Sequence, residues 1–187
     1  MTDAARLIAL LRGDAPRMDM LAAVEALDLP DCWVGAGFVR AAVWDHLHGY
    51  AASPWDADVD VVWFDPARAS STVDRALEAA LAASYATASW SVKNQVRMHV
   101  RNDDAPYAST ADALRHWPET TTAVAVRRAA DRLDVLAPFG LADLFAMLIR
   151  PTPAFSGDRL PRFRQRVHDK RWLERWPRAR VVTPPPA

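Results

Sequence analysis

The apolar residues of this 187-residue chain follow two different spacings, one typical of helices and one typical of strands. In the segment 71–84, apolar residues recur every three or four positions with charged residues between them, which predicts an amphipathic helix. By the same reasoning we expect helices over 3–11, 16–27, 38–47, 71–84, 110–117, 140–149 and 160–176. Shorter apolar runs bounded by turn residues predict strands over 33–34, 58–64, 90–92, 121–127 and 133–137, while 94–101 fits either a strand or a short helix.

Strands interspersed with helices of these lengths predict an α/β (α+β) protein, in which helices pack against a mixed β-sheet. An apolar content of 51% in 187 residues is enough for one sizeable core, and no segment in the middle of the chain has the composition of a linker. We therefore expect a single domain over 1–187, with N-terminal helices in 1–30 and a basic C-terminal helix in 158–180. The proline-rich tail, 183–187, is expected to be disordered.

Two carboxylates, Asp58 and Asp60, stand one residue apart in the apolar strand 58–64. Alternate residues of a strand share a face and lie roughly 6.5 to 7 Å apart along the chain, so both acids project from the same side. Each negative charge raises the pKa of the other carboxyl, and a bound cation such as magnesium offsets that cost. The plainer interpretation is a strand end that exposes acids to water; Trp63 and Phe64, which continue the strand into a core, weigh against it.

A glycine turn precedes the acidic strand. Gly35 and Gly37 let the backbone turn tightly, and the amides at the start of the following helix can then face a phosphate. Arg40 lies one turn inside that helix and can direct its guanidinium at the same phosphates, or else face solvent or pair with an acid. Which of the two glycines serves a phosphate stays open.

The order of glycine turn, helix and acidic strand resembles the signature of the DNA polymerase beta type nucleotidyltransferase superfamily. A longer resemblance, to an uncharacterised bacterial nucleotidyltransferase-like family, rests on the segments 34–40, 43–49, 58–65, 92–99, 137–141 and 150–153. It implies a mixed sheet of the polymerase beta type with a C-terminal helical appendage. It also implies magnesium or manganese on Asp58 and Asp60, and transfer of a nucleoside monophosphate from a nucleoside triphosphate to an acceptor that the sequence does not identify.

The chain departs from the superfamily pattern at two places. It has Gly-Ala-Gly where the pattern prefers Gly-Gly or Gly-Ser, and it has no clear third carboxylate on the neighbouring strand, which offers only Ser91 and Asn94. Asp56 has the parity of the acidic pair and is a weak substitute, whereas Asp65 has the opposite parity. The missing acid leaves room for a nucleotide-binding protein with weak or absent catalysis.

A polar cluster formed by Lys93, Asn94, Arg97 and His99 follows the strand 90–92. The family resemblance makes Lys93, Asn94 and Arg97 candidates for contacts to the triphosphate or the base. Lys93 is suited to phosphate because its ammonium group is a compact charge. The alternative, a salt-bridged surface segment, has equal weight.

Charge and composition limit the remaining functions. The net charge is zero, which argues against a protein that simply coats nucleic acid or an anionic membrane. Residues 158–180 carry nine Lys or Arg against three acids, which indicates an acceptor-binding surface or, as the favoured interpretation, a solvated helix face. One cysteine, Cys32, and scattered histidines do not supply a zinc site. No run approaches the ~20 apolar residues of a membrane span, so we expect a cytoplasmic protein without a membrane partner.

The leading hypothesis is therefore a magnesium-dependent nucleotidyltransferase with Asp58 and Asp60 as catalytic metal ligands. The nucleotide-binding residues are expected to be Gly35, Gly37, Arg40, Lys93, Asn94 and Arg97. A regulatory module that binds nucleotide without turnover is the alternative. An RNA-binding partner protein, suggested by the basic segment 158–180, is a third and less favoured hypothesis.

Overall fold

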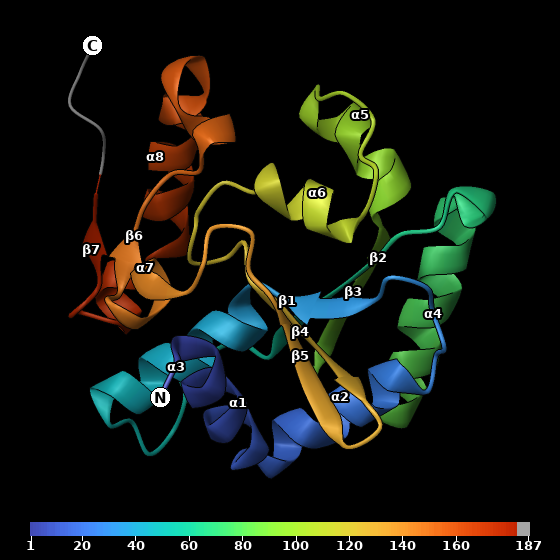
Figure 1. The fold of residues 1–187 in the computed structure, drawn as a ribbon, viewed down its shortest axis with the longest axis horizontal. Coiled ribbons are helices and arrows are strands. Elements are labelled where there is room, and N and C mark those ends of the chain that lie inside the picture. The colour runs from blue at the N-terminus through green and yellow to red at the C-terminus, as the bar shows by residue number, and fades with distance from the viewer. Residues whose placement is uncertain (183–187) are drawn as a thin grey trace.

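The computed structural model describes residues 1–182 (Figure 1). The α-helices are α1 (Asp3–Arg12), α2 (Ala15–Glu25), α3 (Gly37–His48), α4 (Ser71–Ser84), α5 (Met98–Asn102), α6 (Thr110–Arg115), α7 (Ala142–Phe145), α8 (Leu160–Lys170) and α9 (Trp172–Arg175). The strands are β1 (Trp33–Gly35), β2 (Asp58–Trp63), β3 (Ser89–Asn94), β4 (Ala125–Ala129), β5 (Arg132–Leu136), β6 (Leu148–Ile149) and β7 (Arg180–Val181). Short 3-10 turns cover Pro66–Arg68, Gln95–Arg97, Pro153–Phe155 and Gly157–Arg159.

Five strands form the main sheet in the order β3-β2-β1-β4-β5, and β2 and β3 are its one parallel pair in the described chain. The expected mixed sheet with packed helices is thus confirmed. Alternation along β2 divides the strand between two faces, because successive side chains of a strand point to opposite sides. Val59, Val61 and Trp63 are buried in the main core with apolar residues of α1 to α4. Val62 belongs to a smaller cluster with Leu114 of α6, so Asp58 and Asp60 lie on the face that α6 partly covers.

Two expected helices are shorter in the structure. The segment 140–149 is helical over Ala142–Phe145 alone, since Met147 adopts a left-handed backbone (φ 55°) and Leu148–Ile149 then pairs with β7. The segment 160–176 is divided by Arg171 (φ 51°) into α8 and α9. Neither change is visible in apolar spacing, because a left-handed residue other than glycine carries no strong sequence signal.

Two other segments differ from expectation at their ends. The strand expected over 121–127 begins at Ala125, because the amides of Thr122 and Ala123 both donate to the Glu119 carbonyl in a turn. The ambiguous segment 94–101 is helical, with a 3-10 turn followed by α5. The tail 183–187, expected to be disordered, lies outside the described residues.

The C-terminal helices are held against α3 by tryptophans. Trp176 is fully buried, its ring centroid lies 5.5 Å from that of Trp44 in an edge-on arrangement, and its Nε1 donates to Asp45 Oδ1 at 2.7 Å. Trp172 of α9 is also buried. This contact fixes α8 beside the start of α3. In Figure 1, α8 stands along the top of the view with α6 and α5, and Arg159 Nη1, just before α8, donates to Asp104 Oδ1, just after α5, at 2.7 Å. Within residues 1–182, no helix has both the length and the apolar character needed to cross a membrane.

Candidate functional site

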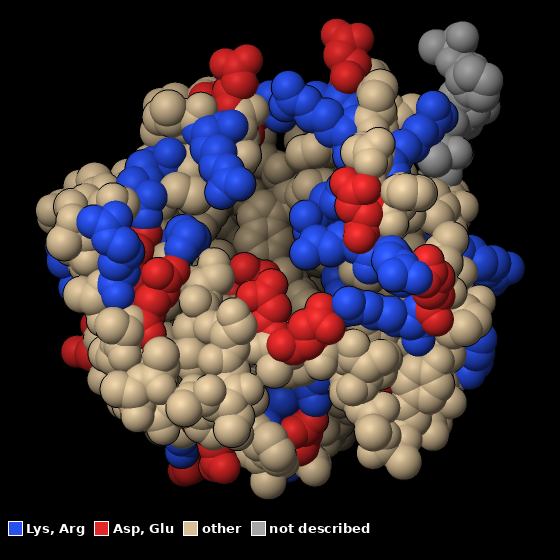
Figure 2. All heavy atoms as spheres, turned by 180° about the vertical axis from the view of Figure 1, so that it is seen from behind, with Lys and Arg blue, Asp and Glu red and all other residues tan. Residues whose placement is uncertain are grey.

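The acidic pair lies on the floor of a pocket of about 260 Å³. Both Asp58 and Asp60 line it, with Asp58 exposed and Asp60 half-buried directly opposite Gly35 in the sheet. Burial, and next the adjacent charge of Asp58, raise the pKa of Asp60 to about 6. Figure 2 shows the hollow, with acidic side chains at its floor and Lys or Arg side chains on both flanks. The ionised form of Asp60 is therefore energetically unfavourable in a pocket that Arg and Lys side chains also line.

The two glycines of the turn have different surroundings. A Cβ on Gly35 would lie 3.1 Å from the Val124 carbonyl oxygen and 3.3 Å from the Trp117 ring, so Gly35 permits close packing of β1 against its neighbours. Gly37 is the first residue of α3 and lines the pocket, where a Cβ would lie 3.2 Å from Trp55 Nε1. The helix start that faces the pocket is thus at Gly37.

Between the glycines, Ala36 adopts φ 53° and ψ −121°. This conformation strongly favours glycine, since a Cβ is sterically crowded in it. Ala36 lines the pocket and caps α3 without a side-chain hydrogen bond, while its amide donates to the Val124 carbonyl at 3.1 Å. The backbone strain is located at the point where the chain enters the pocket, as is common at functional sites.

Arg40 lines the same pocket but is almost entirely buried. Its guanidinium carbon lies 4.4 Å from the ring centre of Trp172 and 5.3 Å from that of Trp176, and its Nε has no hydrogen-bond partner among the described residues. Burial lowers the pKa of Arg40 to about 10, and the nearby charge of Glu119 acts in the opposite direction. Neither alternative from the sequence, a solvent-facing arginine or one paired with an acid, matches this cage of tryptophan rings.

The C-terminal helix α8 forms the cationic wall of the pocket. Arg166 and Lys170 line it from successive turns of α8, and Arg166 Nε donates to Glu119 Oε1 at 2.9 Å. Glu119 is fully buried and also accepts from the Thr122 hydroxyl at 2.7 Å, so the arginine is held by a fixed carboxylate. The interpretation of segment 158–180 as a solvated face therefore does not describe Arg166, which pairs with a buried acid, whereas Lys170 is exposed although it lines the pocket. Around the helix both residues lie beside the buried Phe163 and Val167, and their spacing of four residues along that side is the sequence signal for this wall.

A second pocket, of about 310 Å³, adjoins the first and shares Ala36, Asp60 and Arg166 with it. It extends toward α5 and α6, which supply Arg101 and the neighbouring His116. Lys93 also lines it and pairs with Glu78. Of the residues expected on strand β3 and the following turn, Lys93 is thus the one that shares a pocket with Asp60.

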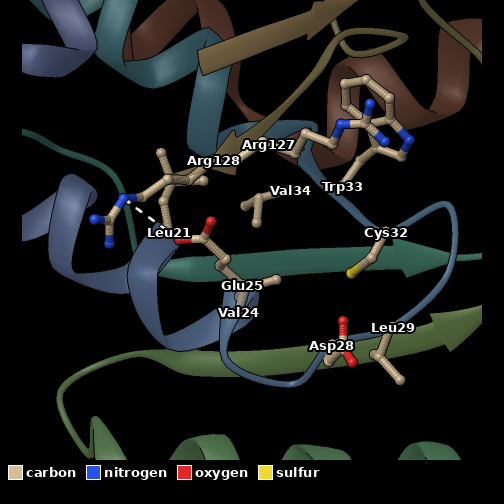
Figure 3. A pocket seen from close by; sticks show the side chains of 11 residues that line it. Leu21, Val24, Glu25, Asp28, Leu29, Cys32, Trp33, Val34, Arg127 and Arg128 are labelled. Carbon is tan, nitrogen blue, oxygen red and sulfur yellow. Dashed lines mark ion pairs between the residues drawn. The ribbon is translucent and has the colours of Figure 1, made fainter. Parts of the chain in front are cut away.

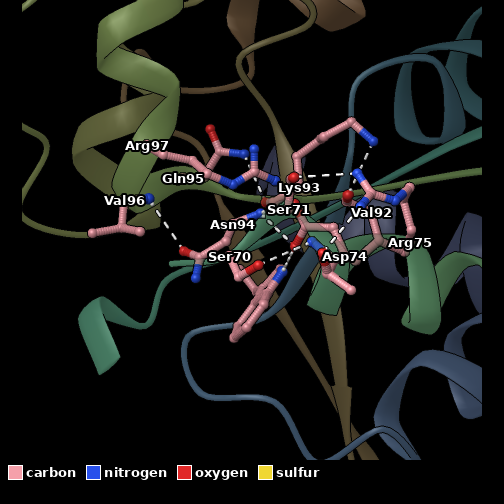
Figure 4. Close-up of polar contacts among 12 residues, drawn as sticks. Ser70, Ser71, Asp74, Arg75, Val92, Lys93, Asn94, Gln95, Val96 and Arg97 are labelled. Atoms are coloured by element: carbon pink, nitrogen blue, oxygen red, sulfur yellow. Dashed lines mark hydrogen bonds and ion pairs between the residues drawn. The ribbon is translucent and has the colours of Figure 1, made fainter. Parts of the chain in front are cut away.

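Asn94 and Arg97 belong to a separate buried network (Figure 4). Asn94 is fully buried: its Nδ2 donates to the carbonyls of Asp65 and Arg68, and its Oδ1 accepts from two backbone amides. Arg97 pairs with Asp74, which is buried and accepts from Trp63 Nε1 at 3.0 Å. Neither Asn94 nor Arg97 lines the two pockets at the acidic pair, and their contacts are those of structural residues.

Another pocket, of about 220 Å³, lies between α2 and the strands β1 and β4 (Figure 3). Cys32 borders it, and burial raises the pKa of the Cys32 thiol to about 12, so the thiol stays protonated and unreactive at neutral pH. Its arginines are paired, Arg127 with Asp134 at 3.0 Å and Arg128 with Glu25 at 3.4 Å. It contains none of the expected site residues.

Residues 1–182 contain no cluster of three His, Cys, Asp or Glu side chains arranged to hold a metal ion. Ser91 stands directly opposite Asp60 on the parallel strand β3. Asp56 reaches the first pocket but pairs with Arg175 at 2.8 Å. The carboxylate and serine oxygens, with the surrounding cations, form a set suited to a hard cation bound together with phosphate oxygens.

Comparisons with known proteins identify the family of the chain and proteins of the same fold. Residues 22–181 match a family model described as "Nucleotidyltransferase". A solved structure described as "The NMR structure of the protein reveals a CCA-adding enzyme head domain" is similar over 95% of each chain, with 32% identity and a TM-score of 0.84. No curated protein sequence matches the chain.

Two larger structures share the fold. One, described as "tRNA-processing enzyme (apo form I)", is 18% identical with a TM-score of 0.55, covering 88% of this chain and 42% of that chain. The other, "Structure of tRNA-processing enzyme complex 3", is 18% identical with a TM-score of 0.53, covering 87% and 43%. The chain therefore spans less than half the length of these two proteins.

Proposed function

We propose a specific reaction for this chain, which belongs to the nucleotidyltransferase family: divalent-metal-dependent transfer of a nucleoside monophosphate from a nucleoside triphosphate to an acceptor hydroxyl. The observation that supports it is the pairing of Asp58 and Asp60 on the floor of a pocket with a cationic wall, beside the first turn of α3. Cations and helix amides suit the triphosphate, and the carboxylates suit the metal.

The residues present fit magnesium or manganese. The donors are hard oxygens, and the raised pKa of Asp60 indicates a carboxylate that lacks a sufficient neutralising charge. Asp58 and Asp60 would hold the metal, which when bound supplies charge neutralisation at the phosphates and a lower pKa for the attacking hydroxyl. Gly37 would offer its helix-start amide to a phosphate oxygen, and Arg166 and Lys170 would bind the outer phosphates.

In the transfer, the acceptor oxygen forms a bond to the α-phosphorus while the bond from that phosphorus to the α–β bridging oxygen breaks. Pyrophosphate leaves with the bond electrons, and the hydroxyl proton passes to solvent through the open pocket. The role of the cationic wall is to bind the charge that develops on pyrophosphate, which is where fixed cations contribute most to catalysis.

Calorimetric titration with the four ribonucleoside triphosphates, with and without magnesium, tests the proposal. We expect metal-dependent binding that is lost in a double variant, Asp58→Asn with Asp60→Asn, and retained in the control Asp65→Asn, which removes an acid beyond the opposite end of β2 and outside the pocket. Pyrophosphate release with a library of acceptors, transfer RNA included because of the similar tRNA-processing enzymes, tests turnover. Equal binding by the double variant and the parent would refute the site.

A second candidate, a nucleotide-binding module without turnover, is favoured by one observation. Ser91 occupies the position opposite Asp60 where a third acid would lie, and a hydroxyl is not a base at neutral pH. Metal-dependent binding without pyrophosphate release would support this candidate. The variant Ser91→Asp then distinguishes a missing acid from a missing acceptor, because added activity in that variant identifies the carboxylate as the absent group.

A further inference from the structure

The two pockets at Asp60 differ in the groups that they offer. The residues suited to a triphosphate, Gly37 at the start of α3 and Lys170 on α8, line only the first pocket. The second pocket opens from the other side of Asp60, toward α5 and α6. Because a transfer reaction needs two substrates on either side of the reacting phosphorus, the second pocket is the place for the acceptor.

The second pocket is electropositive. Asp60 is the one carboxylate that lines it in the described part of the chain, against the cations Lys93, Arg101 and Arg166. Lys93 pairs with Glu78 and Arg166 with Glu119, whereas Arg101 has no acidic partner within residues 1–182. Arg101 is also exposed, so its guanidinium is available to an anion that enters the pocket.

The same pocket also offers flat apolar surface and amide groups. Trp117 and Phe155 line it, both half-buried, which leaves ring surface for a planar ligand. Gln95 Nε2 donates to the Lys93 carbonyl at 2.9 Å and Asn102 Nδ2 donates to the Tyr107 hydroxyl at 3.0 Å. The carbonyl oxygens of both amides accept no hydrogen bond from the described residues, so they can accept from the amino group of a base.

We infer that the second pocket binds the acceptor and that the acceptor is a nucleotide, with a phosphate at Arg101 and its base beside Trp117 and Phe155. This inference rests on the proposed function and adds the acceptor class. A free mononucleotide and the terminal nucleotide of an RNA strand share this chemistry. In either case a ribose hydroxyl provides the attacking oxygen, and a new phosphodiester bond replaces the bond to pyrophosphate.

Binding in the presence of EDTA and without nucleoside triphosphate tests the pocket separately from the reaction. The probes are AMP and a fluorescent single-stranded RNA octamer with a free 3′ hydroxyl. We expect Arg101→Ser to weaken binding of the occupying probe about tenfold, as for loss of a charge-assisted hydrogen bond. Arg115→Ser is the matched control, because Arg115 is an exposed arginine on α6 that does not line the pocket. Phe155→Ala should weaken the same probe.

Each outcome has a defined meaning. Binding of AMP sensitive to Arg101 identifies a mononucleotide acceptor, and sensitive binding of the octamer alone identifies an RNA end. Absence of binding by both probes, or equal losses in Arg101→Ser and Arg115→Ser, overturns the inference. Magnesium-dependent triphosphate binding should be unchanged in Arg101→Ser. If the parent does not bind triphosphate but does bind AMP in a way that depends on Arg101, the proposed reaction is refuted and the assignment of the second pocket as a nucleotide site is retained.

Discussion

Replacement of Asp60 by asparagine should stabilise the metal-free protein at neutral pH while it removes one of the two proposed metal ligands. Burial and the charge of Asp58 give Asp60 a pKa of about 6 in place of its ordinary 3.8. The folded protein therefore holds the Asp60 proton more tightly than the unfolded chain does, and the free energy of unfolding falls as the pH rises from about 4 to about 6. Above pH 6 the full cost is about 3 kcal/mol, which Asp60→Asn avoids.

The assay is urea or thermal unfolding of both proteins in EDTA at several pH values. At pH 7.5 we expect the variant to have a melting temperature about 6–12 °C higher than that of the parent. Near pH 4 most of this difference should be lost, because Asp60 of the folded parent is then protonated and as neutral as the asparagine. Asp58→Asn is the matched comparison and should stabilise less, since it removes the neighbouring charge but leaves Asp60 buried. A difference between parent and Asp60→Asn that is independent of pH would refute the reasoning.

Three further perturbations test other parts of the site. Ala36→Gly should raise the free energy of unfolding by about 1 kcal/mol, as judged by urea denaturation, because it relieves the strain at φ 53° and ψ −121° at some cost in chain entropy. Asp74→Asn should lower stability by about 3 kcal/mol, measured by the same method, with little change in the KM for nucleotide, because it breaks a buried ion pair outside the pockets. Saturating magnesium, at about 100 times its Kd, should stabilise the parent by about 2.7 kcal/mol in thermal unfolding and should not stabilise Asp60→Asn.

The sequence was sufficient for the sheet, for the helices that cover it and for the acidic strand. In β2 the apolar residues alternate with the two acids, so Val59 and Val61 point into the main core while Asp58 and Asp60 point to the opposite face of the sheet. The position of both acids therefore follows from local periodicity. The position of Gly37 at the start of α3 follows from the same strand and turn pattern. These features depend on residues close together in the chain, where the spacing of residues within a strand or helix determines the direction in which their side chains point.

The end of β3 and the turn that follows it show where such reasoning fails. Lys93, Asn94 and Arg97 are polar residues close together in the chain, and nothing in their order distinguishes a ligand contact from a structural one. The distinction depends on Asp74, which lies on α4 and is brought to Arg97 only when α4 packs beside β3. A buried carboxylate must be paired, so Asp74 takes Arg97 as its partner and Arg97 is unavailable to a ligand.

The cationic wall depends on a still longer contact. Arg166 and Lys170 reach the acids because the chain after α8 docks on α3, more than a hundred residues earlier in the chain, through Trp176 and the ring of Trp172 on Arg40. The bond from Arg166 to the buried Glu119 adds a second long-range contact. Burying Arg40 without a full set of hydrogen bonds is costly, and a position that served packing alone would be filled better by an apolar residue. The retained charge makes sense if Arg40 joins α3, whose first turn lines the pocket, to the helices that complete it, so that the floor and the wall form together.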